Sequence, residues 1–452
     1  MTFHLLFIGY PLAGWLIAVC TFVTPLRVRP WVKVSISLLM LAGALKFAFY
    51  SGIGGSMFTP LISRPVFALW SFAFSAVMLL SGFGMALWIL RWTRSAVKRV
   101  LKLVGSRVPR DRGRAGTLAP TIASAEPSRQ VGRDDPAIAS AEPSRQVGRD
   151  DPIAPCQPDG ETRRRLDGGW DWPCASRREF ISGACAAAAT GIAAYGMHEG
   201  LRLPIVERVE IGFPDLPAEF DGYRIVQISD THISSALPGS RTREVVEIVN
   251  SLKGDLVCIT GDIVDGNVED RLADVRPLAD IKSADGLFGC TGNHEYYAGY
   301  DMWRPRFQEF GISMLDNSSV QIRRGGGEIT LGGVVDPVCG YCEPRKVFRK
   351  APQGGFRILL MHRPICMREN SSIGVRLQLS GHTHGGGLNF FRPLVAPHNE
   401  GHIRGLYEEY GMKLYVNAGT GQWAGFPMRI GNPSEITEIT LRKVAAAGGA
   451  GS

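Results

Sequence analysis

Residues 223–232 read YRIVQISDTH, and the type of fold follows from this stretch. A short run rich in Ile and Val is typical of a buried strand, and this one ends in an acid and an imidazole, Asp230 and His232. Four apolar runs downstream end in a similar way. We therefore expect strands at residues 223–229, 256–260, 286–291, 357–361 and 375–379. Between the first two, Thr242–Leu252 carries apolar residues at helical spacing, so the alternation predicts an α/β fold.

Side chains that suit metal binding stand at the end of every expected strand. They lie in the segments Asp230-Thr-His232, Gly261-Asp262, Gly292-Asn293-His294-Glu295, His362 and Gly381-His382-Thr383-His384. In open α/β sheets, ligands bind at the C-terminal ends of the strands. Five of the nine histidines of the chain lie in these segments. A single histidine at a strand end is usually structural, but five such coincidences indicate a shared site.

The residue types and their spacing fit a pair of divalent ions. Carboxylate oxygen and neutral imidazole are good ligands for Mn, Fe, Zn or Co. Asp-x-His and His-x-His place two donors on the same side of an extended chain, because side chains alternate along a strand. One Asp can bridge two ions through its two oxygens. The glycines before Asp262 and Asn293 and after His384 allow turns that bring these ligands close to an ion.

These motifs occur in the order typical of the calcineurin-like metallophosphoesterase family, which the chain resembles over roughly residues 202–442. It is most similar to the membrane-associated bacterial branch with a twin-arginine-type leader. The resemblance implies an αββα sandwich, in which two packed mixed sheets are flanked by helices. It also implies a dinuclear, metal-dependent hydrolase of phosphoric esters. One ion would then be held by Asp230, His232, Asp262 and His384, and the other by Asp262, Asn293, His362 and His382.

The resemblance assigns catalytic roles to two further residues. Two ions would lower the pKa of a water molecule that attacks phosphorus and would stabilise the phosphate oxygens. His294 is not a ligand in this scheme and would donate a proton to the leaving group. Asp265 would orient His294, as a carboxylate fixes an imidazole. The alternatives are a structural histidine at 294 and a turn or helix-start residue at 265.

Some positions depart from the family pattern or keep two interpretations open. Protein phosphatases of the family have Arg where this chain has Gly266, which argues against phosphoproteins as substrates. Close relatives often have Gln at Gly387, so one contact to the substrate is expected to be absent. Asn417 either supports the site or belongs to a Gly-rich turn. Two aromatic pairs either line a substrate cleft or belong to the core: Tyr296/Tyr297 and Phe390/Phe391.

The first ninety residues have the composition of membrane-spanning helices. They contain no Asp or Glu and five Lys or Arg. Apolar runs at 3–25, 31–50 and 66–90 each reach the roughly 20 residues needed to cross a bilayer. Lys46 lies near the end of the second run and is expected to snorkel to the interface. A fourth, shorter run at 181–197 is rich in Ala.

Charged residues beside the apolar runs predict the topology and a means of export. Arg177-Arg178 before the fourth run resembles a twin-arginine export signal, or else marks a cytoplasmic flank. Lys and Arg accumulate in cytoplasmic loops. The first loop and the segment 91–102 are rich in them, whereas residues 51–65 carry only Arg64. We therefore expect a multi-pass protein of the cell membrane whose residues after about 198 are extracytoplasmic.

The linker and the domain boundaries follow from composition. IASAEPSRQVGRDDP at 122–136 is repeated unchanged at 138–152, and it holds too little apolar surface to offset the entropy of ordering. The expected boundaries are 1–95 for three transmembrane helices, 96–175 for a basic disordered linker, 176–198 for the twin-arginine-like segment and fourth apolar helix, 199–445 for the metallophosphoesterase domain and 446–452 for a flexible tail.

Net charge and cysteines say less about function. The pI of about 9.1 would suggest nucleic acid, but residues 181–452 hold 27 Lys or Arg against 30 Asp or Glu. The excess of positive charge lies beside the apolar runs, so no nucleic-acid partner is expected. Cys339 and Cys342 form a lone CxxC, which is a disulfide, a metal site or two unrelated loop cysteines.

The sequence therefore favours a phosphodiesterase or pyrophosphatase that hydrolyses a lipid-linked or other phosphodiester. The expected partners are a phosphoester substrate, with a lipid as the favoured kind, and the membrane. A membrane-anchored sensor that binds a phosphorylated ligand without turnover is one alternative. A general extracytoplasmic phosphatase that scavenges phosphate is another.

Overall fold

The computed structural model describes residues 8–53, 55–56, 59–60, 62–105, 176–349, 351–352 and 354–445. Two compact units are distinguished: Met1–Leu90 with Arg177–Ser452, and Arg91–Ser176. The segments expected to be a linker, 106–175, and a tail, 446–452, lie outside the described residues.

Two six-stranded sheets form the framework of the C-terminal region within the described residues. The first has the order β3 (Ile205–Phe213), β14 (Glu435–Lys443), β4 (Arg224–Ile228), β5 (Leu256–Thr260), β6 (Leu287–Cys290) and β7 (Ile312–Met314). The second has the order β12 (Gly405–Glu409), β13 (Met412–Val416), β11 (Val375–Ser380), β10 (Phe356–Leu360), β9 (Gly327–Gly333) and β8 (Ser318–Arg324). Strands β4, β5 and β6 are parallel, as are β10 and β11, so the five expected strands form as the sequence predicts.

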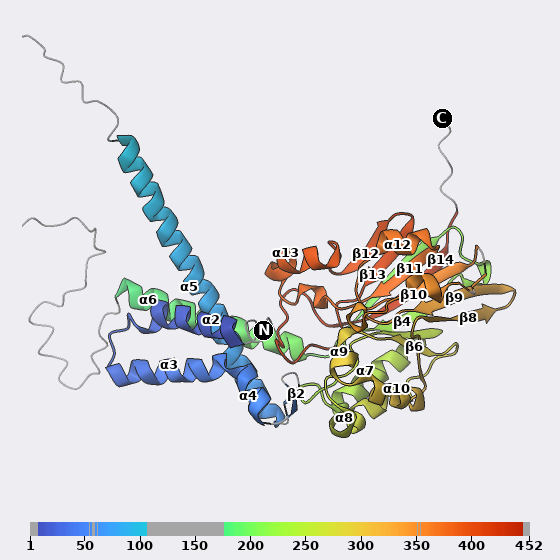
Figure 1. The fold of residues 1–452 in the computed structure, drawn as a ribbon, viewed down its shortest axis with the longest axis horizontal. Coiled ribbons are helices and arrows are strands. Elements are labelled where there is room, and N and C mark those ends of the chain that lie inside the picture. Colours follow the sequence, from blue (N-terminus) through green and yellow to red (C-terminus); the bar gives the residue numbers. More distant parts are fainter. Residues whose placement is uncertain are drawn as a thin grey trace, which may run out of the picture. The chain divides into compact units, whose positions relative to one another are not determined.

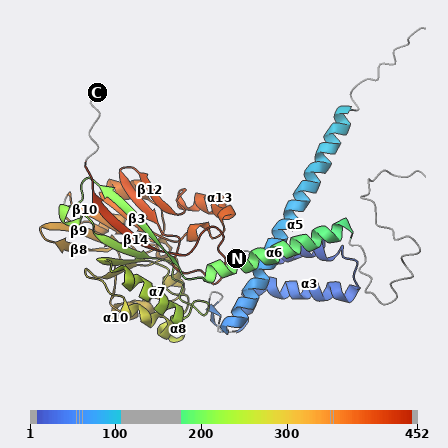
Figure 2. The same ribbon diagram turned by 180° about the vertical axis from the view of Figure 1, so that it is seen from behind.

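Helices cover the outer faces of both sheets, and the main core lies between the sheets. Ile225 and Leu256 of the first sheet share this core with Leu331 and Ile358 of the second. Helices α7 (Gly239–Leu252), α8 (Val268–Val275) and α10 (Tyr300–Glu309) pack on the first sheet. Helices α11 (Pro344–Val347) and α12 (Met367–Ser372) pack on the second. Figures 1 and 2 show these layers, and the expected mixed α/β fold with two sheets is confirmed.

The N-terminal region is helical and apolar. It consists of α2 (Tyr10–Ala18) with the π-helix Val19–Val23, α3 (Pro30–Ala44), α4 (Lys46–Ile53) and the start of α5 (Arg64–Gly105). Helix α6 (Arg177–Leu201) precedes the sheets. Of the helices in the described part of the chain, two are long and apolar enough to cross a membrane, Arg64–Leu101 and Arg177–Leu201. The first two apolar runs form shorter helices, and α5 continues ten residues past the expected boundary at 95.

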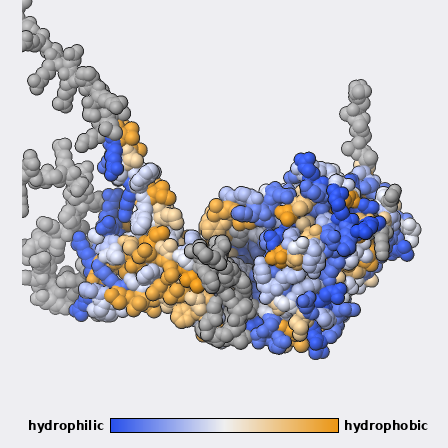
Figure 3. All heavy atoms as spheres, viewed as in Figure 1, coloured by the Kyte–Doolittle hydropathy of each residue, from blue (hydrophilic) through white to orange (hydrophobic). Residues whose placement is uncertain are grey.

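Hydrophobic surface is concentrated over these helices. Figure 3 shows them largely in orange, whereas the two-sheet region is largely blue. Only residues 202–204 separate the end of α6 from the start of β3. The last apolar helix therefore leads directly into the sheet that carries Asp230 and Asp262.

Lys46 does not snorkel, and that expectation was wrong. Its side chain is fully buried, and its Nζ donates hydrogen bonds to the carbonyls of Ala424 and Gly425, at 3.0 Å each. Its Nζ also lies between 5.2 and 5.5 Å from the ring centroids of four aromatic residues: Phe47, Tyr50, Phe67 and Phe74. Two carbonyls and four aromatic faces thus replace the water that snorkelling would have supplied. The loop between β13 and β14, which contains Ala424 and Gly425, is thereby joined to the apolar helices.

Candidate metal centre

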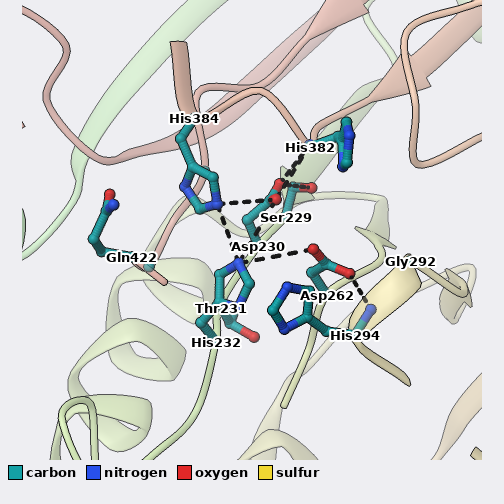
Figure 4. Close-up of polar contacts among 12 residues, drawn as sticks. Ser229, Asp230, Thr231, His232, Asp262, Gly292, His294, His382, His384 and Gln422 are labelled. Atoms are coloured by element: carbon teal, nitrogen blue, oxygen red, sulfur yellow. Dashed lines mark hydrogen bonds and ion pairs between the residues drawn. The ribbon is translucent and has the colours of Figure 1, made fainter. Parts of the chain in front are cut away.

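The side chains expected at the five strand ends converge on one place. Asp230 follows β4, Asp262 follows β5 and Asn293 follows β6, all in the first sheet. In the second sheet, His362 follows β10, and His382 and His384 follow β11. The acids and imidazoles form three groups whose ligand atoms lie within 4.8 Å of one another: Asp230/His232/His384, His232/Asp262/His294 and Asp262/His362/His382. Figure 4 shows contacts that join His384, Asp230, His232 and Asp262.

Asp262 lies between the two halves of the site. Its Oδ2 is 3.8 Å from Nε2 of His232 and 3.2 Å from Nε2 of His362. On one side, Nε2 of His384 lies 3.1 Å from Nε2 of His232 and 3.5 Å from Oδ1 of Asp230. On the other side, Nδ1 of His382 lies 3.2 Å from Nε2 of His362. One carboxylate therefore faces both sets of imidazoles.

Hydrogen bonds fix the orientation of the imidazoles of His232 and His362. Nδ1 of His362 donates to the carbonyl of Thr260 at 2.7 Å, which directs Nε2 toward Asp262. Nδ1 of His232 lies 3.1 Å from Oδ1 of Asp265, which has the same effect. Burial lowers the pKa of His382 to about 3 and also lowers the pKa of His384, so both rings are neutral.

Asn293 provides a further test of whether this donor set fits a metal. Its side chain is buried, and its Oδ1 has no hydrogen-bond partner among the residues that the structure describes. An unpaired buried carbonyl oxygen costs free energy, so it points to a ligand at this position. Amide oxygen, carboxylate and imidazole together are donors that divalent ions accept, and the site therefore fits the expected cofactor.

Backbone strain is concentrated at the same residues. The φ angles of Asp230, His232, Asp262, His382 and His384 lie between 42° and 71°, in the left-handed region. Such conformations cost of the order of 1 kcal/mol or more for residues other than Gly, and they persist where surrounding structure imposes them. Here the strain turns each side chain from the end of its strand toward the centre.

Close packing around the acids explains two of the flanking glycines. A Cβ atom at Gly292 would overlap the carboxylate of Asp262. A Cβ atom at Gly381 would overlap Ser229 and the carboxylate of Asp230. Both positions therefore need Gly because no side chain fits beside the carboxylates.

Asp265 contacts both His232 and His294. Its Oδ1 lies 2.6 Å from Nδ1 of His294 and 3.1 Å from Nδ1 of His232, and it is fully buried. Burial opposes protonation of His294, but the charges of Asp262 and Asp265 outweigh it and raise the pKa of His294 to about 9. The imidazole of His294 therefore carries a proton at neutral pH when only protein charges act on it.

Three residues of the site were not assigned a role from the sequence. Glu295 accepts hydrogen bonds from the backbone N–H groups of Asp262, Ile263 and Gly292, at 2.6 to 2.9 Å. Arg429 is fully buried, donates to the carbonyl of Gly421 at 2.7 Å and lies 3.2 Å from Nδ1 of His384. The ring of Trp423 lies 6.4 Å from that of His294. Glu295, as an acid inside the Gly-Asn-His-Glu motif, could have been found; no spacing singles out the other two.

Replacing Glu295 by Gln is expected to loosen the two turns that it joins. The amide NH2 group would face at least one of three buried backbone donors and leave it unpaired, which costs about 1–3 kcal/mol of unfolding free energy. Metal affinity should fall about 10- to 100-fold, because Asp262 is held less firmly. Chemical denaturation and chelator competition measure the two effects. Glu309→Gln, at an exposed position of α10, is the control; equal behaviour of the two variants would contradict this role.

The remaining expectations at the edge of the site have the following outcomes. Asn417 accepts a hydrogen bond from the N–H of Gly419 and donates to Thr437, so it braces the Gly-rich turn. Tyr297 is 54% exposed, and its ring centroid lies 5.3 Å from that of His294, while Tyr296 packs against the core. Cys339 and Cys342 are free thiols.

Several known proteins are similar to this chain in sequence. The family model described as calcineurin-like phosphoesterase matches residues 223–386. A transmembrane protein with metallophosphoesterase domain from Danio rerio is 34% identical over 268 residues, 56% of this chain and 60% of that protein. An uncharacterized metallophosphoesterase of Helicobacter pylori strain J99 is 34% identical over 253 residues, 54% of this chain and 66% of that protein.

A third relative is matched over almost its whole length. It is an uncharacterized metallophosphoesterase of Bacillus subtilis, 30% identical over 281 residues, which make up 59% of this chain and 98% of the relative. The chain thus spans less than two thirds of the first two relatives and nearly all of the third. The chain belongs to the calcineurin-like metallophosphoesterase family, a family of phosphoester hydrolases that use divalent metals.

Proposed function

We propose that the protein is a phosphodiesterase or pyrophosphatase that works with two divalent ions. The observation that carries this proposal is the position of Asp262 between two sets of imidazoles. The ligands in this proposal are those implied by the resemblance. They are Asp230, His232, Asp262 and His384 for one ion, and Asp262, Asn293, His362 and His382 for the other.

His294 and Asp265 carry the proton chemistry in this proposal. Two bound ions supply the charge that makes a water molecule acidic enough to attack phosphorus and that stabilises the phosphate oxygens. His294 is not needed as a ligand, and its ring reaches the partly open side of the site beside Tyr297. In this proposal His294 donates a proton to the leaving oxygen. Asp265 holds Nδ1 of the ring, so that Nε2 faces the substrate.

The proposed substrate is an amphiphilic diester or pyrophosphate rather than a phosphoprotein. Gly266 offers no guanidinium to a phosphate where protein phosphatases have Arg. Only residues 202–204 join the apolar helix α6 to the first strand, and such a short tether raises the effective concentration of membrane substrates at the site. A lipid-linked phosphoester is therefore favoured over a soluble one.

The proposed location is the cell membrane, with several spans and an extracytoplasmic catalytic domain. A twin-arginine-type signal at Arg177-Arg178 would export the domain after it folds, with its metals in place. A reporter that is active only outside the cytoplasm, fused after Ser452, should be active, because the Lys and Arg counts place residues after about 198 outside. The same fusion with a cytoplasmic reporter should be silent. The reverse pattern would contradict the proposed topology.

Hydrolysis by the purified full-length protein tests the proposed activity. The chain, stripped of metal and then supplied with Mn, Fe, Zn or Co, should hydrolyse bis(p-nitrophenyl) phosphate. Binding of the diester without turnover, with any of these metals, would favour the sensor instead. The short contact of 2.6 Å between His294 and Asp265 argues for turnover, because binding alone has no need of a held proton donor. Faster hydrolysis of soluble nucleotide esters than of every lipid tested would favour the scavenging phosphatase.

A further inference from the structure

A cavity of about 660 Å³ lies between the apolar helices and the loop that carries Trp423. Its volume is in the range of sites that bind small molecules. Its walls come from α2, α4, α5, the segment 386–395 and the loop 423–426, all within the same compact unit. The lining residues on which the argument depends are Tyr10, Phe47, Met78, Gly386, Leu394 and Trp423.

No charged side chain is among these lining residues. Only Tyr10 and Trp423 carry a polar side-chain atom, and the rest are aliphatic, aromatic, Pro or Gly. Water in such a space would find too few hydrogen-bond partners to be well held. The chemistry of the walls therefore suits hydrocarbon and excludes a phosphate, a sugar or a charged peptide.

The cavity adjoins the metal centre through shared residues. Trp423 lines the cavity, and its ring centroid lies 6.4 Å from that of His294. Gly386 lines the cavity as well and follows His384 by two residues. A molecule whose phosphate lies beside His294 can therefore place an attached chain along Trp423 without leaving the protein.

The cavity has an apolar opening. Three of its lining residues are exposed, Tyr10 by 64%, Phe391 by 37% and Leu394 by 68%. Phe390, exposed by 56%, packs its ring against Phe391 at a centroid distance of 4.7 Å. Exposed apolar residues around an apolar opening are typical of a site that takes its ligand from an apolar phase.

The wall beside the metal centre is held in place without a ligand. Lys46 binds the carbonyls of Ala424 and Gly425, and Phe47 stacks on Trp423 with ring centroids 6.3 Å apart. The loop is thus fixed to α4 immediately next to the cavity. A preformed wall reduces the ordering cost of binding.

We infer that this cavity binds an alkyl chain of the phosphoester whose phosphate lies at the metal centre. The inference rests on the proposed function and adds which part of the protein selects the substrate. The metal ligands recognise the phosphate, and the residues of α5 and of the segment 386–395 recognise the hydrocarbon. The substrate class is then an alkyl or acyl phosphodiester or pyrophosphate, and chain length sets its specificity.

The test is a series of p-nitrophenyl alkyl phosphates, from ethyl to decyl, with the full-length protein in nanodiscs. The readout is the ratio of kcat/KM for the decyl and ethyl esters, compared between variants so that partition into the bilayer cancels. Met78→Trp fills the cavity from α5. Each methylene that loses its apolar contact is worth about fourfold in binding, so the ratio should fall about tenfold or more.

Two matched controls separate the cavity from general effects. Met85→Trp introduces the same ring one heptad further along α5, where Met85 is exposed and does not line the cavity. Its ratio should equal that of the wild type. Leu394→Arg acts from the segment 386–395 at an exposed position, so it does not depend on Met78→Trp folding, and it should lower the ratio as well. Leu406→Arg on β12 is its control. The two control variants, Met85→Trp and Leu406→Arg, should hydrolyse the ethyl ester at the wild-type rate.

The outcomes distinguish this inference from the proposed function. Normal hydrolysis of the ethyl ester with unchanged ratios in Met78→Trp and Leu394→Arg overturns the inference and leaves the proposed function intact. If no ester is hydrolysed with any metal, the proposed function fails. The inference about the cavity is then tested separately, by titrating the protein with decyl methylphosphonate and with ethyl methylphosphonate. Tighter binding of the decyl compound to wild type, lost in Met78→Trp and kept in Met85→Trp, would support it; equal binding of both compounds would overturn it.

Discussion

Asp262→Asn should remove more metal and more activity than a change at any other candidate ligand. Its carboxylate faces imidazoles on both sides, with Nε2 of His232 at 3.8 Å and Nε2 of His362 at 3.2 Å. Asn keeps the shape but loses the charge and one acceptor, so both sets of imidazoles lose the carboxylate that they share. We expect kcat/KM to fall roughly 10³-fold or more, because bound ions contribute several kcal/mol to transition-state stabilisation.

Elemental analysis of the purified protein measures the metal content directly. His362→Ala, which removes a residue from one set only, should retain more metal than Asp262→Asn. Asp270→Asn, at an exposed position of α8, is the matched control and should behave as wild type. Two ions retained at wild-type affinity in Asp262→Asn would show that this carboxylate does not bridge.

The second large effect is expected from His294→Ala. Since His294 donates the proton in our proposal, its loss should lower kcat about 10²- to 10⁴-fold for esters with poor leaving groups. Metal content should stay near that of the wild type, because all seven candidate ligands remain. The loss should shrink for p-nitrophenyl esters, whose leaving group needs little protonation. His398→Ala, at an exposed histidine, is the control.

The pH dependence provides an independent measurement for the same residue. The charges of Asp262 and Asp265 raise the pKa of His294 to about 9 when only protein groups act on it, and bound cations would lower it toward neutrality. In the wild type, activity on poor leaving groups should therefore decline as pH rises through the pKa of His294. This alkaline decline should be absent in His294→Ala. Equal losses for good and poor leaving groups, with an unchanged pH profile, would falsify the role of His294 as the acid.

The strands and most of the candidate site could be predicted because their signals are local. Each acid or imidazole directly follows its own apolar run, as Asp230 follows β4 and His382 follows β11. Parallel pairing then brings the strand ends together, which is a general property of α/β sheets. The contact between Asp265 and His294 could be predicted for the same reason, since both residues belong to motifs at neighbouring strand ends.

The rest depends on contacts between segments that are distant in sequence. Arg429 stands alone in a segment rich in Gly and Pro, and only the folded loop shows that it lies beside His384. The sequence does not distinguish Trp423 from any other aromatic residue in a loop, and only the structure shows that it stacks on Phe47. Lys46 was expected at an interface because it lies near the end of its apolar run. Its partners are carbonyl oxygens, which every residue has and which no sequence pattern can single out.

The position of the partners of Lys46 also imposes an order on biosynthesis. The lysine is separated from Ala424 by 378 residues. At about 5–20 residues per second, a ribosome needs on the order of 20 to 80 seconds to make that interval. Throughout this time the ammonium group lacks the two carbonyls that will hold it. The amino-terminal helices therefore reach their final packing only when the last tenth of the chain has emerged, and a chain truncated before Ala424 keeps Lys46 among apolar helices without its acceptors.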